Sequence, residues 1–114
     1  MSKMNNASYF QPKQSGTWVE VDPGVERMIM GYDQHVMMVK VRFRKGAIGA
    51  LHSHIHIQST YIASGTFEVT INGNTALLNA GDTFFVASDL VHGVVCKEEG
   101  VLVDVFHPCR EDFL

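Results

Sequence analysis

Short stretches of alternating apolar and polar residues run through most of the chain. Residues 37–44 alternate between apolar and mainly basic side chains, and residues 67–71 alternate between apolar and polar ones. A period of two is the pattern of a β-strand with one buried face. The dipeptide Asn72-Gly73 follows the second stretch and is typical of a tight β-hairpin. We therefore expect strands in both stretches and a hairpin turn after the second.

Residues that favour turns separate these stretches at short intervals. The turn signals recur from Asp22-Pro23-Gly24 to Glu98-Glu99-Gly100, and most runs between them are five to eight residues long. This spacing is typical of an all-β sandwich or barrel, and no stretch keeps the 3.6-residue period of a helix. A chain of 114 residues has room for one domain. We expect that domain over residues 16–114, preceded by a polar arm over residues 1–15 that is either disordered or exchanged with a partner.

Composition and charge exclude several classes of protein. Hydrophobic residues make up 46% of the chain and charged residues 18%, as in ordinary globular proteins. The net charge is −3, and the basic residues cluster only at 42–45, so we expect no nucleic-acid partner. No apolar run approaches the roughly 20 residues that cross a bilayer, and residues 1–15 contain no apolar secretion signal. The sequence predicts a cytoplasmic protein with no membrane partner.

One predicted strand carries a carboxylate on an apolar face. In residues 101–106, Asp104 shares its side of the strand with Leu102 and Phe106. Two interpretations remain open. Asp104 either lies at a strand edge in water, or it is buried, in which case desolvation raises its pKa towards a value useful for acid–base chemistry.

Residues 52–58 concentrate side chains that bind metals. His52 and His54 lie two residues apart, so on a strand they share a face with Cα atoms about 7 Å apart, which suits two imidazoles on one ion. A straight strand would put Gln58 about 20 Å from His52. Gln58 joins the two histidines only if the chain bends around residues 55–57, and the direction of His56 is then unpredictable. A histidine-rich surface patch without a function is the alternative.

The rest of such a site has to come from another part of the chain. His92 follows the Gly81-Asp82 turn and a short apolar run, and it is the candidate. His35 and His107 are more typical of loop or surface residues.

The spacing of these residues resembles the two motifs of the cupin family. The first motif is matched at Gly46, His52, His54, position 58 and Gly65, with glutamine in place of the usual glutamate. The second motif is matched at Gly81 and His92 and departs from the family at Ala87, Asp89 and Cys96. The resemblance implies a double-stranded β-helix, a small jelly-roll barrel. It also implies a metal held by His52, His54, Gln58 and His92.

A glutamine ligand changes the charge of the expected metal site. Three imidazoles and one amide are neutral, so one divalent transition metal keeps its full charge. This favours polarisation of a carbonyl or hydroxyl and attraction of an anionic substrate. The donor set suits nickel, zinc, iron or manganese.

The C-terminal residues 102–114 resemble a group of small cupins that ketonise 4,5-unsaturated monouronates from pectin or alginate. That resemblance implies catalytic roles for Asp104, Phe106 and Arg110, a small sugar acid as substrate, and a homodimer. The guanidinium of Arg110 suits bidentate binding of a carboxylate, although pairing with Glu111 or Asp112 is the alternative. For Phe106 the alternative is a position in the hydrophobic core. Two other functions remain open: a non-haem iron oxygenase acting on a small organic acid, and a non-catalytic metal- or sugar-binding module.

Overall fold

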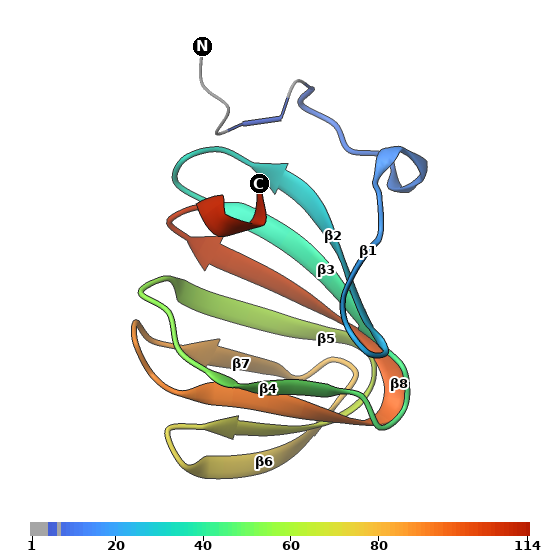
Figure 1. Cartoon of the computed structure of the whole chain (residues 1–114), viewed down its shortest axis with the longest axis vertical. Helices are drawn as coiled ribbons and strands as arrows, with labels where there is room; N and C mark the ends of the chain where they lie inside the picture. Colours follow the sequence, from blue (N-terminus) through green and yellow to red (C-terminus); the bar gives the residue numbers. More distant parts are fainter. Residues whose placement is uncertain (1–4, 7) are drawn as a thin grey trace.

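Eight antiparallel strands make up most of the protein, a computed structural model of which describes residues 5–6 and 8–114 (Figure 1). The strands are β1 (Val19–Asp22), β2 (Val25–Tyr32), β3 (Met37–Phe43), β4 (Ile48–His52), β5 (Ile57–Ile71), β6 (Asn74–Asn79), β7 (Thr83–Val86) and β8 (His92–His107). Two short 3-10 turns, η1 (Lys13–Ser15) and η2 (Glu111–Phe113), flank them. Within the described ranges there is no α-helix, and no helix has the length and apolarity to cross a membrane.

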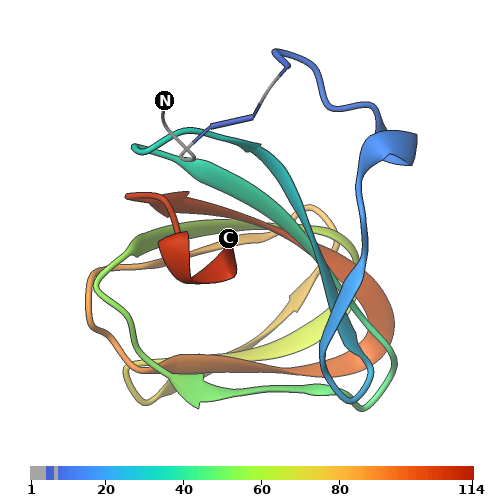
Figure 2. The same ribbon diagram turned by 45° about the horizontal axis from the view of Figure 1, so that its top comes forward.

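The long strands β5 and β8 join two sheets into a barrel. They pair with each other along most of their length, and the register shifts between Ile62 and Phe67, where both strands bend. The second half of β8 also pairs with β3, whereas its first half pairs with β4. In the same way β5 pairs with β7 and then with β6. Figure 2 shows the two curved layers facing each other. The predicted all-β jelly-roll barrel is confirmed.

The apolar faces predicted from alternation point into the barrel. Val39 and Phe43 of β3 and Phe67 of β5 are buried, and the rings of Phe43 and Phe67 meet edge to face at 5.2 Å between centroids. The predicted hairpin joins β5 to β6, with positive φ angles of 50° at Asn72 and 80° at Gly73. The side chains that the alternation predicts to be buried are therefore the ones that pack in the core along these strands.

Gly65 lies where β5 and β8 cross closely. Its φ is +84°, and a Cβ added there would lie 2.6 Å from the carbonyl oxygens of both Glu98 and Glu99. We expect Gly65→Ala to lower the free energy of unfolding by about 3 kcal/mol or more, since strain and a backbone clash combine. Gly73→Ala is the matched control, because its φ is +80° but a Cβ meets nothing within 4 Å. Gly73→Ala should lower the free energy of unfolding by about 1 kcal/mol. Chemical denaturation measures both variants, and equal losses of unfolding free energy would contradict the argument.

The expected N-terminal arm is described only in part, since residues 1–4 and 7 lie outside the described residues. Asn6 is tied to β2: its Nδ2 donates to the carbonyl of Met30, and its Oδ1 accepts from the backbone N–H of Tyr32. The prediction of disorder or exchange for residues 1–15 stays a prediction.

Candidate metal centre and cavity

Three histidines from two parts of the chain converge in the barrel. One ring nitrogen of each of His52, His54 and His92 lies within 4.8 Å of the other two. His52 ends β4 and is the cross-strand partner of His92, the first residue of β8. His54 lies in the loop after β4, so the expectation that both early histidines share a strand is wrong. The pairing of β4 with β8, and not the strand spacing alone, brings the rings together.

Backbone carbonyls orient all three rings through Nδ1. Each Nδ1 lies within hydrogen-bonding distance of a carbonyl oxygen: His52 with Ala50 at 2.7 Å, His54 with His56 at 2.9 Å, and His92 with Leu90 at 2.9 Å. A carbonyl only accepts, so each Nδ1 donates, and the neutral ring keeps its lone pair on Nε2. Burial lowers the pKa of His92 to about 4 and also lowers that of His54. These two rings are therefore neutral at neutral pH and available as ligands.

Gln58 adds an oxygen to the same group. The chain turns between β4 and β5, as the sequence predicts, and buries Gln58 near the start of β5. Its Oε1 lies 3.1 Å from Nε2 of His54 and 3.2 Å from Nε2 of His92. Its Nε2 donates to Thr60 and Asp104, which turns the oxygen towards the histidines. Four atoms with lone pairs thus face one another, an arrangement that fits a transition-metal ion held by oriented ligands.

Asp104 lies directly behind this group and is buried. It stands in β8 between Val39 of β3 and Thr60 of β5, so the strand-edge interpretation is wrong. Its Oδ1 accepts hydrogen bonds from Thr60 at 2.6 Å and from Gln58 at 3.2 Å. Burial raises the pKa of Asp104 to about 6, although the Thr60 hydrogen bond and the charge of Arg110 oppose the shift. The carboxyl therefore changes protonation nearer neutrality than an ordinary aspartate.

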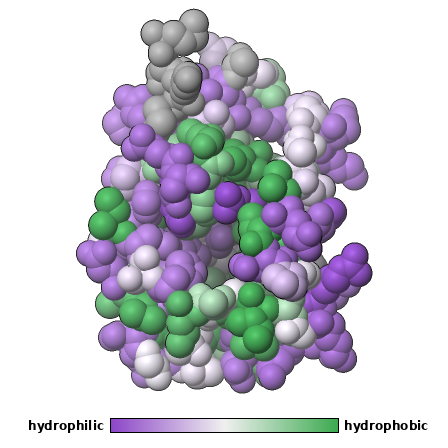
Figure 3. All heavy atoms as spheres, in the orientation of Figure 1, coloured by the Kyte–Doolittle hydropathy of each residue, from purple (hydrophilic) through white to green (hydrophobic). Residues whose placement is uncertain are grey.

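His52, His54, His92 and Gln58 together form the candidate metal-binding group. A cavity of about 430 Å³ opens beside it. Its wall includes the site residues His52, Gln58, Asp104, Phe106 and Arg110, together with Arg27 and Phe113. The η2 turn lies at the mouth of the barrel in Figure 2, and Figure 3 shows the surface hollowed between the two sheets.

Arg110 is paired rather than free in this cavity. Its Nε and Nη2 donate to the two carboxylate oxygens of Asp112 at 3.0 and 2.9 Å. Its guanidinium also lies 4.9 Å from the centre of the Phe106 ring. The alternative pairing considered from the sequence is thus present, and the second edge of the guanidinium is left to meet a ligand.

The sequence interpretation missed two residues of the site. Thr60 orients both Gln58 and Asp104, and its position two residues after Gln58 placed it on the same strand face. Arg27 lies on the cavity wall, and the alternation of Val25, Arg27 and Ile29 already put a charge on an apolar face.

The remaining histidines lie outside the group. His56 is half-buried, and its Nδ1 has no hydrogen-bond partner among the described residues. His35 and His107 are exposed, as expected.

The barrel and its converging imidazoles define a class of small β-barrel proteins with a candidate metal centre at the mouth. The Cupin domain family model matches residues 39–106, which include all four candidate ligands. The chain belongs to the cupin family.

Individual relatives show which cupins this chain is similar to. The pectin degradation protein KdgF of Dickeya dadantii is 48% identical over 99 residues, which cover 85% of this chain and 90% of that protein. The crystal structure of an RmlC-like cupin from Shewanella frigidimarina superposes with a TM-score of 0.93 at 38% identity, covering 97% of this chain and all of the other. The structure of KdgF from Halomonas sp. gives 0.90 at 34% identity, covering 95% of this chain and all of that one. The chain is therefore a homologue of a pectin degradation protein.

Proposed function

We propose that this protein is a metal-dependent enzyme that ketonises 4,5-unsaturated monouronates, the breakdown products of pectin or alginate, to the linear 5-keto-4-deoxyuronate. The observation that carries the proposal is a buried carboxylate, Asp104, hydrogen-bonded to Gln58 beside three converging histidines. The similarity to KdgF supports the substrate class. The two arginines in the cavity support an anionic substrate.

The metal would be held by His52, His54, His92 and Gln58. A bound divalent ion supplies Lewis-acid polarisation of substrate oxygens. Because all four ligands are neutral, the ion would keep its charge, which suits a substrate carboxylate and a developing alkoxide. Nickel, zinc, iron and manganese all accept this donor set.

Asp104 would move the proton that the reaction transfers. Ring opening removes the proton of the C1 hydroxyl, forms the C1 carbonyl and breaks the bond from C1 to the ring oxygen. The enolate left at C5 becomes a ketone when a proton is added at C4, so the sugar is isomerised with no atom gained or lost. A carboxylate that takes the first proton and returns it at C4 completes this cycle. Among the residues that the structure describes, Asp104 is the one acidic side chain that both lines the cavity and contacts Gln58.

Phe106 and Arg110 would orient the sugar. Phe106 is buried in a core cluster and also lines the cavity, where its ring offers a flat apolar wall with its centroid 5.8 Å from that of His54. Arg110 contributes positive charge and the unpaired edge of its guanidinium. Both side chains line the same cavity as Asp104.

The decisive experiment is an assay of the purified, metal-loaded chain on 4,5-unsaturated galacturonate without oxygen. We expect loss of the ultraviolet absorbance of the conjugated double bond, appearance of the keto acid by NMR, and no conversion after chelation. Absence of conversion with all four metals would contradict the proposal. Conversion that requires oxygen and iron would instead favour the oxygenase, and tight binding without turnover would favour a binding module. The homodimer and the cytoplasmic location stay predictions.

A further inference from the structure

Arg27 is a cation on the inner face of β2 to which the mechanism above assigns no individual role. Its neighbours of the same parity, Val25 and Ile29, pack against the two hydrophobic clusters of the barrel. Arg27 itself is half-buried and lines the cavity that also contains Asp104. A charged side chain on an otherwise apolar face is costly unless something compensates for its burial.

Within the described residues, no anion is hydrogen-bonded to Arg27. No ion pair or hydrogen bond joins its side chain to any residue in the described ranges 5–6 and 8–114. Burial lowers the pKa of Arg27 and the charge of Arg110 lowers it further, whereas the charge of Asp112, which is hydrogen-bonded to Arg110, raises it. Asp22 also reaches the cavity wall, but it is exposed at the end of β1. The guanidinium of Arg27 therefore lines the cavity with its N–H groups unpaired among the described residues.

The two arginines of the cavity share one aromatic ring but differ in their partners. The guanidinium carbon of Arg27 lies 3.7 Å from the centre of the Phe113 ring, and that of Arg110 lies 4.1 Å from it. Contact with an aromatic ring holds a guanidinium in place and leaves its N–H groups free to donate. Asp112 balances the charge of Arg110 through two hydrogen bonds. Arg27 has no such partner.

We propose that Arg27 is the carboxylate-binding residue of the cavity, where it pairs bidentately with the ring carboxylate of a sugar acid. The identity of the sugar acid rests on the proposed function, whereas the anion subsite rests on the geometry of Arg27. Phe113 holds the guanidinium in place, and Arg110 adds a second cation whose own charge is already balanced. The cavity of about 430 Å³ falls in the size range of small-molecule sites.

Binding measurements on the metal-loaded full chain test this directly, with D-galacturonate as the probe and D-galactose as its neutral match. We expect the parent to prefer galacturonate. Arg27→Gln should weaken galacturonate binding about tenfold or more, because a fixed charge-assisted pair is lost, and should leave galactose binding unchanged. Arg27→Lys should recover part of the lost affinity, since lysine restores the positive charge but cannot form the bidentate pair of a guanidinium.

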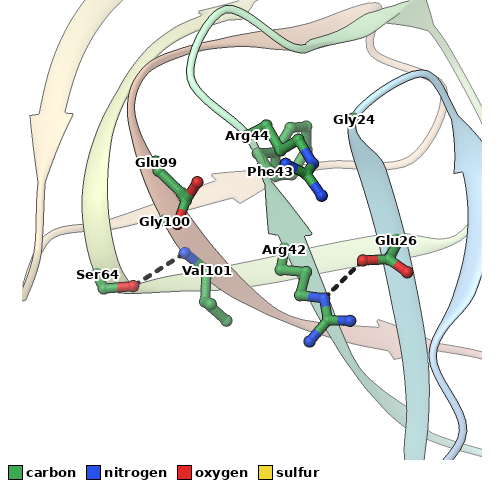
Figure 4. Close-up of a pocket in the computed structure, with 9 residues that line it drawn as sticks. All are labelled: Gly24, Glu26, Arg42, Phe43, Arg44, Ser64, Glu99, Gly100 and Val101. Atoms are coloured by element: carbon green, nitrogen blue, oxygen red, sulfur yellow. Dashed lines mark hydrogen bonds and ion pairs between the residues drawn. The ribbon is translucent and has the colours of Figure 1, made fainter.

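Arg42→Gln is the matched control. Arg42 lies on the neighbouring strand β3, pairs with Glu26 at 2.7 Å and stacks on Trp18 at 4.0 Å. Figure 4 shows this pair in a separate pocket of about 360 Å³. The variant makes the same chemical change outside the proposed site, so it should bind both sugars as the parent does.

Three results would overturn the subsite: no preference of the parent for galacturonate, equal binding by Arg27→Gln and the parent, or equal losses for both sugars. In the ketonisation assay, Arg27→Gln should raise KM for the unsaturated uronate about tenfold with kcat within a few-fold of the parent. If the parent ketonises and KM is unchanged, the subsite fails and the proposed function stands. If the parent does not ketonise but Arg27 still controls galacturonate binding, the proposed function fails and the subsite stands.

Discussion

Asp104→Asn is expected to reduce ketonisation about 10³-fold, the scale of general acid–base catalysis, while the metal content stays that of the parent. Asparagine has the shape of aspartate, and its Oδ1 can still accept the hydrogen bonds that Thr60 and Gln58 donate. Gln58 therefore keeps its orientation towards the histidines. Only the ability to take up and return a proton is lost.

The measurement combines elemental analysis with turnover of the unsaturated uronate. Asp33→Asn is a matched control, because Asp33 lies in the loop between β2 and β3, outside the metal-binding group and the cavity, and accepts from the backbone N–H groups of His35 and Val36. It should keep the parent rate. A parental rate in Asp104→Asn would remove Asp104 from the mechanism, and loss of metal in that variant would show a structural role instead.

His52→Ala is expected to empty the metal site and abolish turnover. His52 supplies one of the three imidazoles, yet it is exposed, so its removal opens no cavity in the core. The metal-free variant should therefore unfold close to the metal-free parent. The parent, unlike His52→Ala, should gain stability from metal, by about 2.7 kcal/mol at one hundred times its Kd.

Thermal unfolding with and without added metal checks this expectation, together with metal stoichiometry. His35→Ala is the control, since His35 is exposed in a loop outside the metal-binding group. It should respond to metal as the parent does. If His52→Ala binds metal with parental affinity, the proposed donor set is wrong.

Much of the fold was predictable because local pattern and burial agree. The alternation at Val39 and Phe43 and the hairpin at Asn72-Gly73 depend on neighbouring residues alone, and the structure has both. The bend before Gln58 was predictable only once Gln58 was taken as a ligand of the same ion as His52, because a straight strand cannot bring the two residues together.

The rest of the site depends on pairings between distant strands. Whether Asp104 is buried depends on β3 and β5 covering it from both sides, and alternation within β8 does not reveal that. The partner of Arg110 depends on how η2 folds back over the cavity. The alternation within β2 places Arg27 on the face that points into the barrel. A long arginine side chain can still extend its charged end from such a face into water. The alternation alone therefore does not show that Arg27 binds a ligand.

The way β5 and β8 run through both sheets has a consequence for folding. Neither sheet can form completely before the other, because each long strand contributes hydrogen bonds to both. Partners such as Met37 and Phe106 are distant in sequence, and such a topology folds slowly because long loops must close first. Amide hydrogen exchange should therefore report a single cooperative opening for the two strands. The imidazoles of β4 and β8 come together only after the long strands have paired. The protein should therefore bind its metal late in folding.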